Sequence, residues 1–465
     1  MEQLNSISEK FSSLAWGIPL LVLLIGGGLY LLVLSRFLPF RFFGHAIKVL
    51  RGKYDDPNDP GEISHFKALT TALSSTIGMG NISGVALAIA VGGPGAMFWM
   101  WVSAIVGMST KFFTSTLAIM YRGKDSNGEL QGGPMYFIRE GLGKNWKFLA
   151  IMFSVFGMLG ALPVVNVNQL KQAINDIVLI PNGVEVSLST NLIIAAVLVI
   201  VTTIVVLGGL KRISSIASKM VPSMVILYFV LVLIILVINY TEVPKYFMMI
   251  FTDAFDANFM TIEGKKDVFG GVLGALVLLG IKRGAFSNEA GIGTAPMAHG
   301  AAKTDEPVRE GLVAMLGPVI DTLIVCTLTA LAILVTGVWK IDGLNGVSLT
   351  ASAFQNAMPG IGQYLLMICV FIFSISSLFS YAYYGKKCMS FLAGAHNKQY
   401  YNYFYILSII LAATTEFEVM INFIDGIFAF MAIPTMLATI LLAPKVVKEL
   451  KVYIHNLKTE KPNDR

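Results

Sequence analysis

Long apolar runs follow one another along this sequence from residue 14 to residue 443. A helix needs about 20 apolar residues to cross the hydrocarbon core of a bilayer. Eleven runs approach or exceed that length, and the sequence therefore predicts an all-α polytopic membrane protein with 11 transmembrane helices. The expected spans are 14–36, 67–91, 95–121, 148–178, 190–208, 218–239, 268–292, 308–337, 361–393, 400–414 and 420–443.

The composition leaves no room for a large soluble domain. Hydrophobic residues make up 55% of the 465 residues and charged residues only 13%, whereas charged residues approach a quarter of a soluble protein. We expect residues 1–465 to form a single membrane domain, with 14–36 as an extra N-terminal helix and 444–465 as a cytoplasmic tail. The three cysteines form no CxxC pair and the five histidines are scattered, so the sequence indicates neither a disulfide framework nor a metal cluster.

The basic residues are distributed unevenly between alternate loops. Loops on one side of the predicted membrane, with the adjoining span ends, hold about 25 of the 34 Lys and Arg residues, and the opposite side holds about five. Because cytoplasmic loops are enriched in Lys and Arg, this asymmetry places the C-terminus in the cytoplasm and the N-terminus outside. It also accounts for the net charge of +6 without a nucleic-acid partner.

The predicted span 67–91 is interrupted at its middle by Gly78, Gly80 and Asn81. Each glycine costs a helix interior roughly 1 kcal/mol relative to alanine. Unwound backbone at membrane depth must find partners inside the protein, so such an interruption is expected to line a cavity. A packing surface of the GxxxG type is the alternative, since Gly80 and Gly84 are four residues apart.

A second span, 268–292, is interrupted in the same way by Gly280, Gly284 and the sequence GIG at 291–293. The eleven spans then divide into one extra helix and two halves of five helices, each half opening with a broken helix. An odd number of helices per half makes the two topologies inverted, which is typical of secondary transporters with a binding site at the bilayer midplane. The two predicted repeats are 67–239 and 268–443.

Longer motifs coincide with these features: GMGNISGVA at 78–86, GGPGAMFWMW at 92–101, LQGGPMYFI at 130–138, RGAFSNEAGIGTAP at 283–296 and DTLIVCTLTALAIL at 321–334. Through them the chain resembles the alanine or glycine:cation symporter family over roughly residues 60–440. The resemblance implies a leucine-transporter-type fold and sodium-coupled symport of a small neutral amino acid into the cell by alternating access. It also implies a bacterial or archaeal plasma membrane and no enzymatic activity.

The resemblance further implies a small neutral amino acid, a sodium ion and membrane lipid as partners. No cofactor is expected besides Na+ as the coupling ion, and no obligatory protein partner. An amino-acid-gated channel or a membrane amino-acid sensor on the same scaffold is the alternative function.

The first break offers groups for an amino-acid carboxylate. Free backbone N–H groups and a half-helix N-terminus attract a negative charge. Gly78 and Gly80 allow close approach of the backbone to a ligand, and the amide of Asn81 can orient the unwound segment.

The α-amino group needs acceptors, which carbonyl oxygens around Gly280 and Gly284 are expected to supply. Asn168 matches the asparagine of the family's substrate-facing span, and Phe286 aligns with the family's aromatic residue that covers the substrate. Amides at bilayer depth also hold helices together, so that role stays open for Asn168 and for Asn166.

Hydroxyl and carbonyl oxygens suit a sodium ion, because it is a hard cation. Aligned from its closing YYG, the run FIFSISSLFSYAYYG at 371–385 places Ser376 and Ser377 on the family's paired hydroxyls. In this fold carbonyl oxygens near Ser74 and Ile77 would complete the cation site. The alternative is that these serines bond carbonyls of their own helix.

The chain departs from the family pattern at Tyr381, where the family usually has Trp in the substrate pocket. We expect an altered preference for substrate size. Charged residues within spans suggest function, and for Asp321 we favour an ion pair with Arg283, with a further cation or proton-linked site as the alternative.

Overall fold

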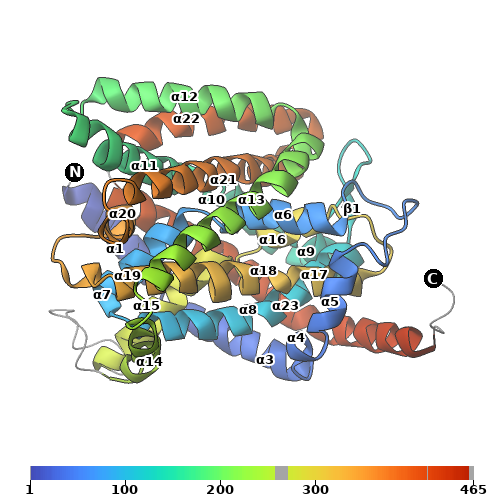
Figure 1. The fold of residues 1–465 in the computed structure, drawn as a ribbon. Helices are drawn as coiled ribbons and strands as arrows, with labels where there is room; N and C mark the ends of the chain where they lie inside the picture. The colour runs from blue at the N-terminus through green and yellow to red at the C-terminus, as the bar shows by residue number, and fades with distance from the viewer. Residues whose placement is uncertain (1, 257–270, 416, 460–465) are drawn as a thin grey trace.

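The computed structural model describes residues 2–256, 271–415 and 417–459, which form an almost wholly α-helical bundle (Figure 1). The first half contains α1 (Glu2–Ala15), α2 (Ile18–Leu21), α3 (Gly27–Leu34), α4 (Leu38–Arg41), α5 (Phe43–Leu50), α6 (His65–Thr76), α7 (Val85–Gly92), α8 (Ala96–Met120), α9 (Pro134–Leu142), α10 (Lys147–Gly160), α11 (Val164–Ile174), α12 (Leu188–Val206), α13 (Gly209–Ile238) and α14 (Val243–Asp253). The second half contains α15 (Gly271–Asn288), α16 (Ala295–His299), α17 (Pro307–Ala314), α18 (Leu316–Pro318), α19 (Thr327–Val335), α20 (Gly346–Ala357), α21 (Gly362–Ala393), α22 (Tyr400–Thr414) and α23 (Phe417–Thr459).

Short segments of other geometry join these helices. The π-helical turns are η1 (Val22–Gly26), η2 (Gly80–Gly84), η4 (Asn175–Leu179) and η7 (Val319–Cys326). The 3₁₀ turns are η3 (Lys144–Trp146), η5 (Ile180–Asn182), η8 (Val338–Lys340) and η9 (Ala395–Gln399). Strands β1 (Gly123–Lys124) and β2 (Leu130–Gln131) form an antiparallel hairpin in which Gly123 pairs with Gln131.

Most predicted spans appear as helices long and apolar enough to cross a membrane. Among the described residues seven helical stretches meet this condition, and two bent helix pairs raise the number to nine. The seven are Ala96–Met120, Lys144–Asn182, Leu188–Val206, Gly209–Ile238, Pro307–Val335, Gly362–Ala393 and Glu418–Thr459. Of the other predicted spans, 400–414 is the 15-residue helix α22, and 268–292 begins outside the described residues. The total of eleven and the inverted repeat therefore stay predictions.

The predicted break in span 67–91 is confirmed. Helix α6 stops at Thr76, and the helix resumes at Gly80 with its axis turned by 53°. The second bent pair lies in the N-terminal segment, where Ser6–Ala15 and Ile18–Leu34 meet at 46°.

The second break lies at the predicted sequence GIG, 291–293, but the prediction that Gly280 and Gly284 also interrupt the helix is wrong. Helix α15 continues through both glycines to Asn288, and the chain is non-helical from 289 to 294. Both glycines instead allow α15 to approach α8 closely. A Cβ atom on Gly280 would lie 2.5 Å from the Cβ of Trp99, and one on Gly284 would lie 2.8 Å from the Cβ of Ser103. Such small residues are common where membrane helices pack against each other.

Other elements extend the predicted map. Helix α20 packs against the turn η2 at the first break. Helix α23 continues without interruption through Pro444 to Thr459, so much of the predicted tail 444–465 is helical. Helix α9 follows directly after the β-hairpin.

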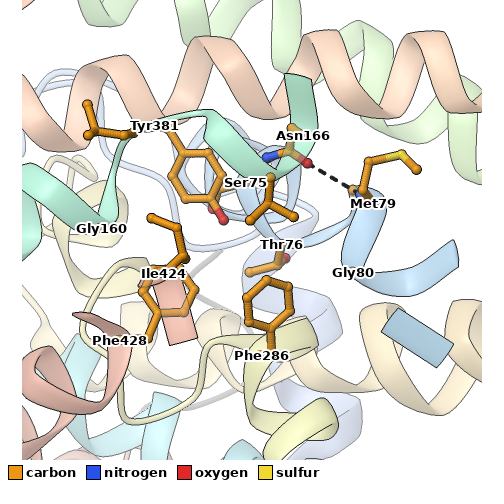
Figure 2. A pocket seen from close by; sticks show the side chains of 13 residues that line it. Ser75, Thr76, Met79, Gly80, Gly160, Asn166, Phe286, Tyr381, Ile424 and Phe428 are labelled. Carbon is orange, nitrogen blue, oxygen red and sulfur yellow. Dashed lines mark hydrogen bonds between the residues drawn. The ribbon is translucent and has the colours of Figure 1, made fainter. Parts of the chain in front are cut away.

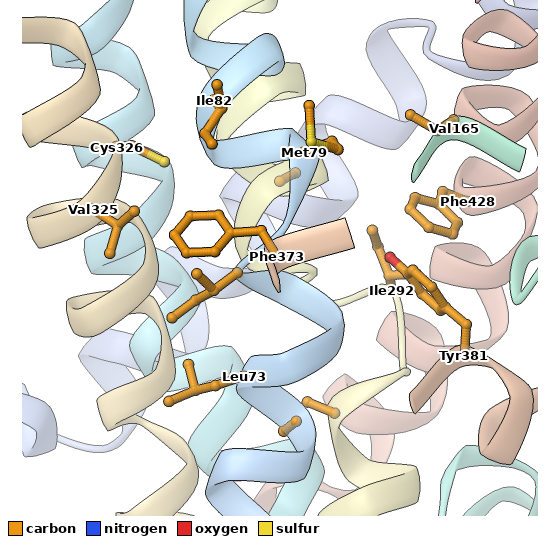
Figure 3. Packing of buried hydrophobic residues seen from close by; sticks show 14 of the residues in the cluster. Leu73, Met79, Ile82, Val165, Ile292, Val325, Cys326, Phe373, Tyr381 and Phe428 are labelled. Atoms are coloured by element: carbon orange, nitrogen blue, oxygen red, sulfur yellow. The ribbon is translucent and has the colours of Figure 1, made fainter. Parts of the chain in front are cut away.

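The interior is apolar and the outer face is apolar as well. One large cluster of buried residues runs through the bundle, and Figure 3 shows part of it around Leu73, Val325 and Phe373. On the outer helices, side chains such as Leu188 of α12 and Ile226 of α13 are 63% exposed. An apolar exterior of this kind is expected where helices face lipid.

The two breaks lie next to each other within the bundle. A Cβ atom on Gly80 would lie 3.4 Å from the ring of Phe286 and 3.6 Å from the Cα of Ser287. Segments more than 200 residues apart in the sequence thus face one another at the breaks.

Candidate functional site

The side chain of Asn81 stabilises the non-helical backbone of the first break by hydrogen bonds. Ile77 follows α6 with extended backbone (φ −76°, ψ 90°), which ends the helix. The amide N–H of Gly78 donates to Oδ1 of Asn81 at 3.0 Å. The Nδ2 of Asn81 donates to Oδ1 of Asp321 at 2.6 Å. The side chain of Asn81 therefore links the unwound segment to η7.

The second break is shaped by backbone of the left-handed region. Glu289, directly after α15, has φ +54°, and Gly291 and Gly293 have φ +85° and +104°. The N–H of Ala290 donates to Oδ1 of Asn288 at 2.9 Å, which turns the chain away from the helix axis. Glycine adopts positive φ without strain, whereas Glu289 does so at a cost.

A small cavity lies between the first break and the last turn of α15 (Figure 2). The volume that the centre of a water molecule can occupy in this cavity is about 20 Å³, which is enough for about one water. Figure 2 shows the rings of Tyr381, Phe286 and Phe428 turned toward this space. The residues that line it are Ser75, Thr76, Gly78, Met79, Gly80, Gly160, Leu162, Val165, Asn166, Phe286, Tyr381, Ile424 and Phe428.

Four of the predicted substrate-site residues are brought together around this cavity, namely Gly78, Gly80, Phe286 and Tyr381. Asn81 lies directly behind the lining, bonded to Gly78. Gly284 does not reach the cavity lining, because it packs against Ser103 of α8. The structure therefore does not support a substrate contact for Gly284.

The two asparagines of α11 point in different directions. Asn166 lines the cavity, and its Oδ1 accepts from the N–H of Met79 at 3.4 Å (Figure 2). Asn168 lies outside the lining and donates to the carbonyl oxygens of Ala412 and Thr415 at the end of α22. Residues two apart on a helix lie about 200° apart around its axis, so one amide faces the cavity and the other holds two helices together.

The predicted sodium ligands are divided by the structure. Ser377 Oγ lies beside the first break, 2.6 Å from where a Cβ of Gly78 would stand. Ser376 Oγ instead faces α13, 3.6 Å from the sulfur of Met224. Both hydroxyls also donate to the carbonyl oxygen of Phe373, as the alternative expectation had it.

The rest of the predicted sodium set lies at the end of α6. The carbonyl groups of its last turn have no following helical N–H to bond, and this turn contains Ser74, with Ile77 directly after it. Ser74 Oγ bonds the hydroxyl of Ser380, one turn from Ser377 on α21. Ser380 is therefore a neighbour of this region that the predicted set left out, although its i, i+3 spacing from Ser377 indicated a shared face.

The expected ion pair between Asp321 and Arg283 is wrong. Asp321 Oδ2 accepts instead from the hydroxyls of Ser287 and Thr322, each at 2.7 Å. Arg283 pairs with Asp425 of α23 at 3.4 Å, and Lys282 pairs with the same carboxylate at 2.7 Å. The position of Arg283 in the sequence did not show which neighbouring helix supplies its carboxylate partner.

Several lining residues were not predicted as site residues. Ile424 and Phe428 lie on α23. Because apolar residues lie on every side of this helix, its sequence does not show which residues face the cavity. Ser75 and Thr76 directly precede the first break, and this position in the sequence could have indicated that they line the cavity.

A helical membrane bundle in which two broken helices meet at a buried, partly polar cavity is the architecture of a secondary transporter. The fold resembles that of a solved transporter with the leucine-transporter fold, MhsT in complex with L-phenylalanine, with a TM-score of 0.58. The likeness covers 85% of this chain and 99% of that chain at 14% sequence identity.

Sequence comparisons give the family. The chain belongs to the sodium:alanine symporter family, whose model matches residues 1–465. It is 40% identical over 463 residues to the sodium/alanine symporter AgcS of Methanococcus maripaludis, covering 98% of this chain and 99% of the relative. It is 33% identical to the probable sodium/glutamine symporter GlnT of Bacillus subtilis, covering 97% and 91%. The chain is thus a multi-pass, sodium-coupled amino-acid transporter and not an enzyme.

Proposed function

We propose that this transporter carries a small neutral amino acid of the alanine or glycine type into the cell together with Na+, by alternating access. The observation that carries the proposal is a cavity lined by Gly78 and Gly80 at the first break and by Phe286 in the last turn of α15, directly before the second break. Backbone groups freed by the breaks can bind a zwitterion and a cation side by side.

The carboxylate is assigned to the start of the second half of the first broken helix. The N–H end of Gly80–Gly92 carries partial positive charge. Of the nearby amides, that of Gly78 is bonded at 3.0 Å to Asn81, whereas that of Met79 makes only a 3.4 Å bond to Asn166. The N–H of Met79 is therefore the donor that a substrate carboxylate can engage with the smaller loss.

The cation is assigned to the opposite side of the same break. The end of α6 carries partial negative charge on its carbonyl oxygens, including those of Ser74 and Ile77. Ser377 donates its proton to the carbonyl of Phe373 at 3.0 Å, so its oxygen lone pairs are free to face a cation. We retain Ser74, Ile77 and Ser377 as ligands and leave out Ser376.

The narrow cavity favours a small substrate over a bulky one. The cavity holds about one water in the present conformation, so an amino acid enters only with movement of the surrounding helices. Rings of Tyr381, Phe286 and Phe428 border the space, and a bulky side chain would have to displace them.

The test is uptake of labelled alanine or glycine by the purified protein in proteoliposomes. Accumulation is expected when Na+ is high outside, and Ser377→Ala should raise the half-saturating Na+ concentration about tenfold, the effect of roughly 1.4 kcal/mol. Ser376→Ala is the matched control and should leave it near the wild-type value. Uptake indifferent to the Na+ gradient would overturn the coupling, and ligand-evoked current without accumulation would indicate a channel.

A further inference from the structure

The phenol of Tyr381 is held by a buried carboxylate that no part of the proposed site uses. Tyr381 projects from α21 and lines the cavity. Its hydroxyl donates to Oε1 of Glu289 at 2.5 Å. The other oxygen of this carboxylate, Oε2, accepts from the hydroxyl of Thr294. Glu289 is 1% exposed, and each of its two oxygens therefore serves one hydroxyl.

The backbone at Glu289 adds an independent observation. Among the described residues, three that are not glycine have positive φ, namely Arg36, Phe37 and Glu289. In the same break, the positive-φ positions 291 and 293 are glycines. A side chain kept at a strained position is a reason to look for a function in that side chain. Here the side chain connects the second break to the cavity wall.

The bond to Glu289 decides what Tyr381 presents to a substrate. Because the hydroxyl is occupied, the ring rather than a hydrogen-bond donor faces the cavity. The ring of Tyr381 is attached to α21 at one end and hydrogen-bonded to Glu289 at the other, so its position at the cavity is fixed. A hydrophobic wall of fixed position discriminates side chains by size, typically by about 10- to 200-fold per methylene.

We propose that Glu289 is a positioning residue that sets the upper size limit of the substrate side chain by holding the ring of Tyr381 against the cavity. The inference rests on the proposed function, because it concerns the amino-acid site. It assigns the altered residue at position 381 a partner, and it makes substrate size depend on the second break as well as on α21.

A double-mutant cycle distinguishes this positioning role from a purely structural contact. A purely structural hydrogen bond between α21 and the second break would affect folding but not the relative affinity for large and small substrates. A positioning residue acts through Tyr381, so removing the phenolic hydroxyl must remove the influence of Glu289 on selectivity. The two mutations are then not additive in a double-mutant cycle.

The experiment measures selectivity of the full-length protein in proteoliposomes. Sodium-driven uptake of labelled alanine is inhibited by unlabelled glycine, serine, leucine and glutamine, and each half-inhibitory concentration is divided by that of unlabelled alanine. The variants are Tyr381→Phe, Glu289→Gln and the double variant. Tyr405→Phe is the matched control, since its buried hydroxyl donates to the carbonyl of Leu378 at 2.6 Å, away from the cavity.

We expect Tyr381→Phe to lower the leucine and glutamine ratios about tenfold. Glu289→Gln, which keeps one acceptor oxygen for two hydroxyls, should give a smaller decrease, and the double variant should match Tyr381→Phe alone. Unchanged ratios in Tyr381→Phe, or full additivity in the double variant, would overturn the inference. If Glu289→Gln does not fold, Tyr381→Phe against Tyr405→Phe still decides it. A wild-type protein that takes up no small neutral amino acid refutes the proposed function itself, whatever the variants do.

Discussion

At the scale of single residues, the two asparagines of α11 separate binding from packing. Asn166 faces the cavity and contacts Met79 at 3.4 Å, while Asn168 bonds two carbonyl oxygens at the end of α22. We expect Asn166→Ala to raise the half-saturating alanine concentration several-fold with little change in melting temperature. Asn168→Ala should lower the melting temperature, because losing buried hydrogen bonds costs about 1–3 kcal/mol.

Transport kinetics and thermal unfolding in detergent check this pair, each variant serving as the control for the other. The reverse pattern, with loss of affinity in Asn168→Ala and loss of stability in Asn166→Ala, would contradict the assignment of the cavity to Asn166.

These same residues show how far sequence reasoning reaches. Gly78 and Gly80 marked the first break because an interruption in an apolar span is visible in the chain itself, and Tyr381 and Phe286 at the cavity followed from family motifs. The orientation of Asn166 against Asn168 did not follow, because it depends on where α11 begins after Pro163.

At the scale of elements, the second break shows a different limit. A glycine in a span is a helix breaker or a packing site, and Gly280 and Gly284 proved to be packing sites against α8. The break itself begins at Glu289, a residue type that rarely adopts positive φ. Neighbouring helices, which a single sequence does not specify, decide between these outcomes.

Elements of both breaks are joined by a buried cluster at their far ends. His65 is the first residue of α6 and His299 the last of α16, and the Nδ1 atoms of both bond the carboxylate of Glu310 on α17. All three residues are 0–1% exposed. Adjacent backbone bonds, such as Lys303 N–H to the carbonyl of Ile63 at 2.7 Å, hold the same segments together. The cluster thus fastens the two broken helices to one another.

Glu310→Gln should loosen this fastening, because the amide offers one acceptor oxygen in place of two. We expect amide hydrogen exchange in 60–66 and 297–304 to accelerate by about tenfold, corresponding to roughly 1.4 kcal/mol of local opening. Glu306→Gln is the control, since Glu306 caps α17 through Val308 and does not bond either histidine. Equal acceleration in both variants would show that the carboxylate at 310 has no special role.

At the scale of the whole molecule, composition and periodicity were the strongest predictors. Apolar runs located the long helices, since each must satisfy its own backbone hydrogen bonds in lipid. Run length alone did not show that α23 continues to Thr459 or that α20 would pack on the first break. Those features depend on contacts between distant segments.

The orientation of the molecule is the remaining prediction at this scale. Helix α1 and the end of α23 lie toward opposite ends of the bundle (Figure 1). Because about 25 of the 34 Lys and Arg residues fall on one predicted side, that side should be cytoplasmic. In right-side-out vesicles, external protease should remove an N-terminal tag and leave a C-terminal tag intact, and inverted vesicles should give the opposite result. Removal of both tags from the same face would require an even number of crossings, and with it a different partition of the chain into two halves.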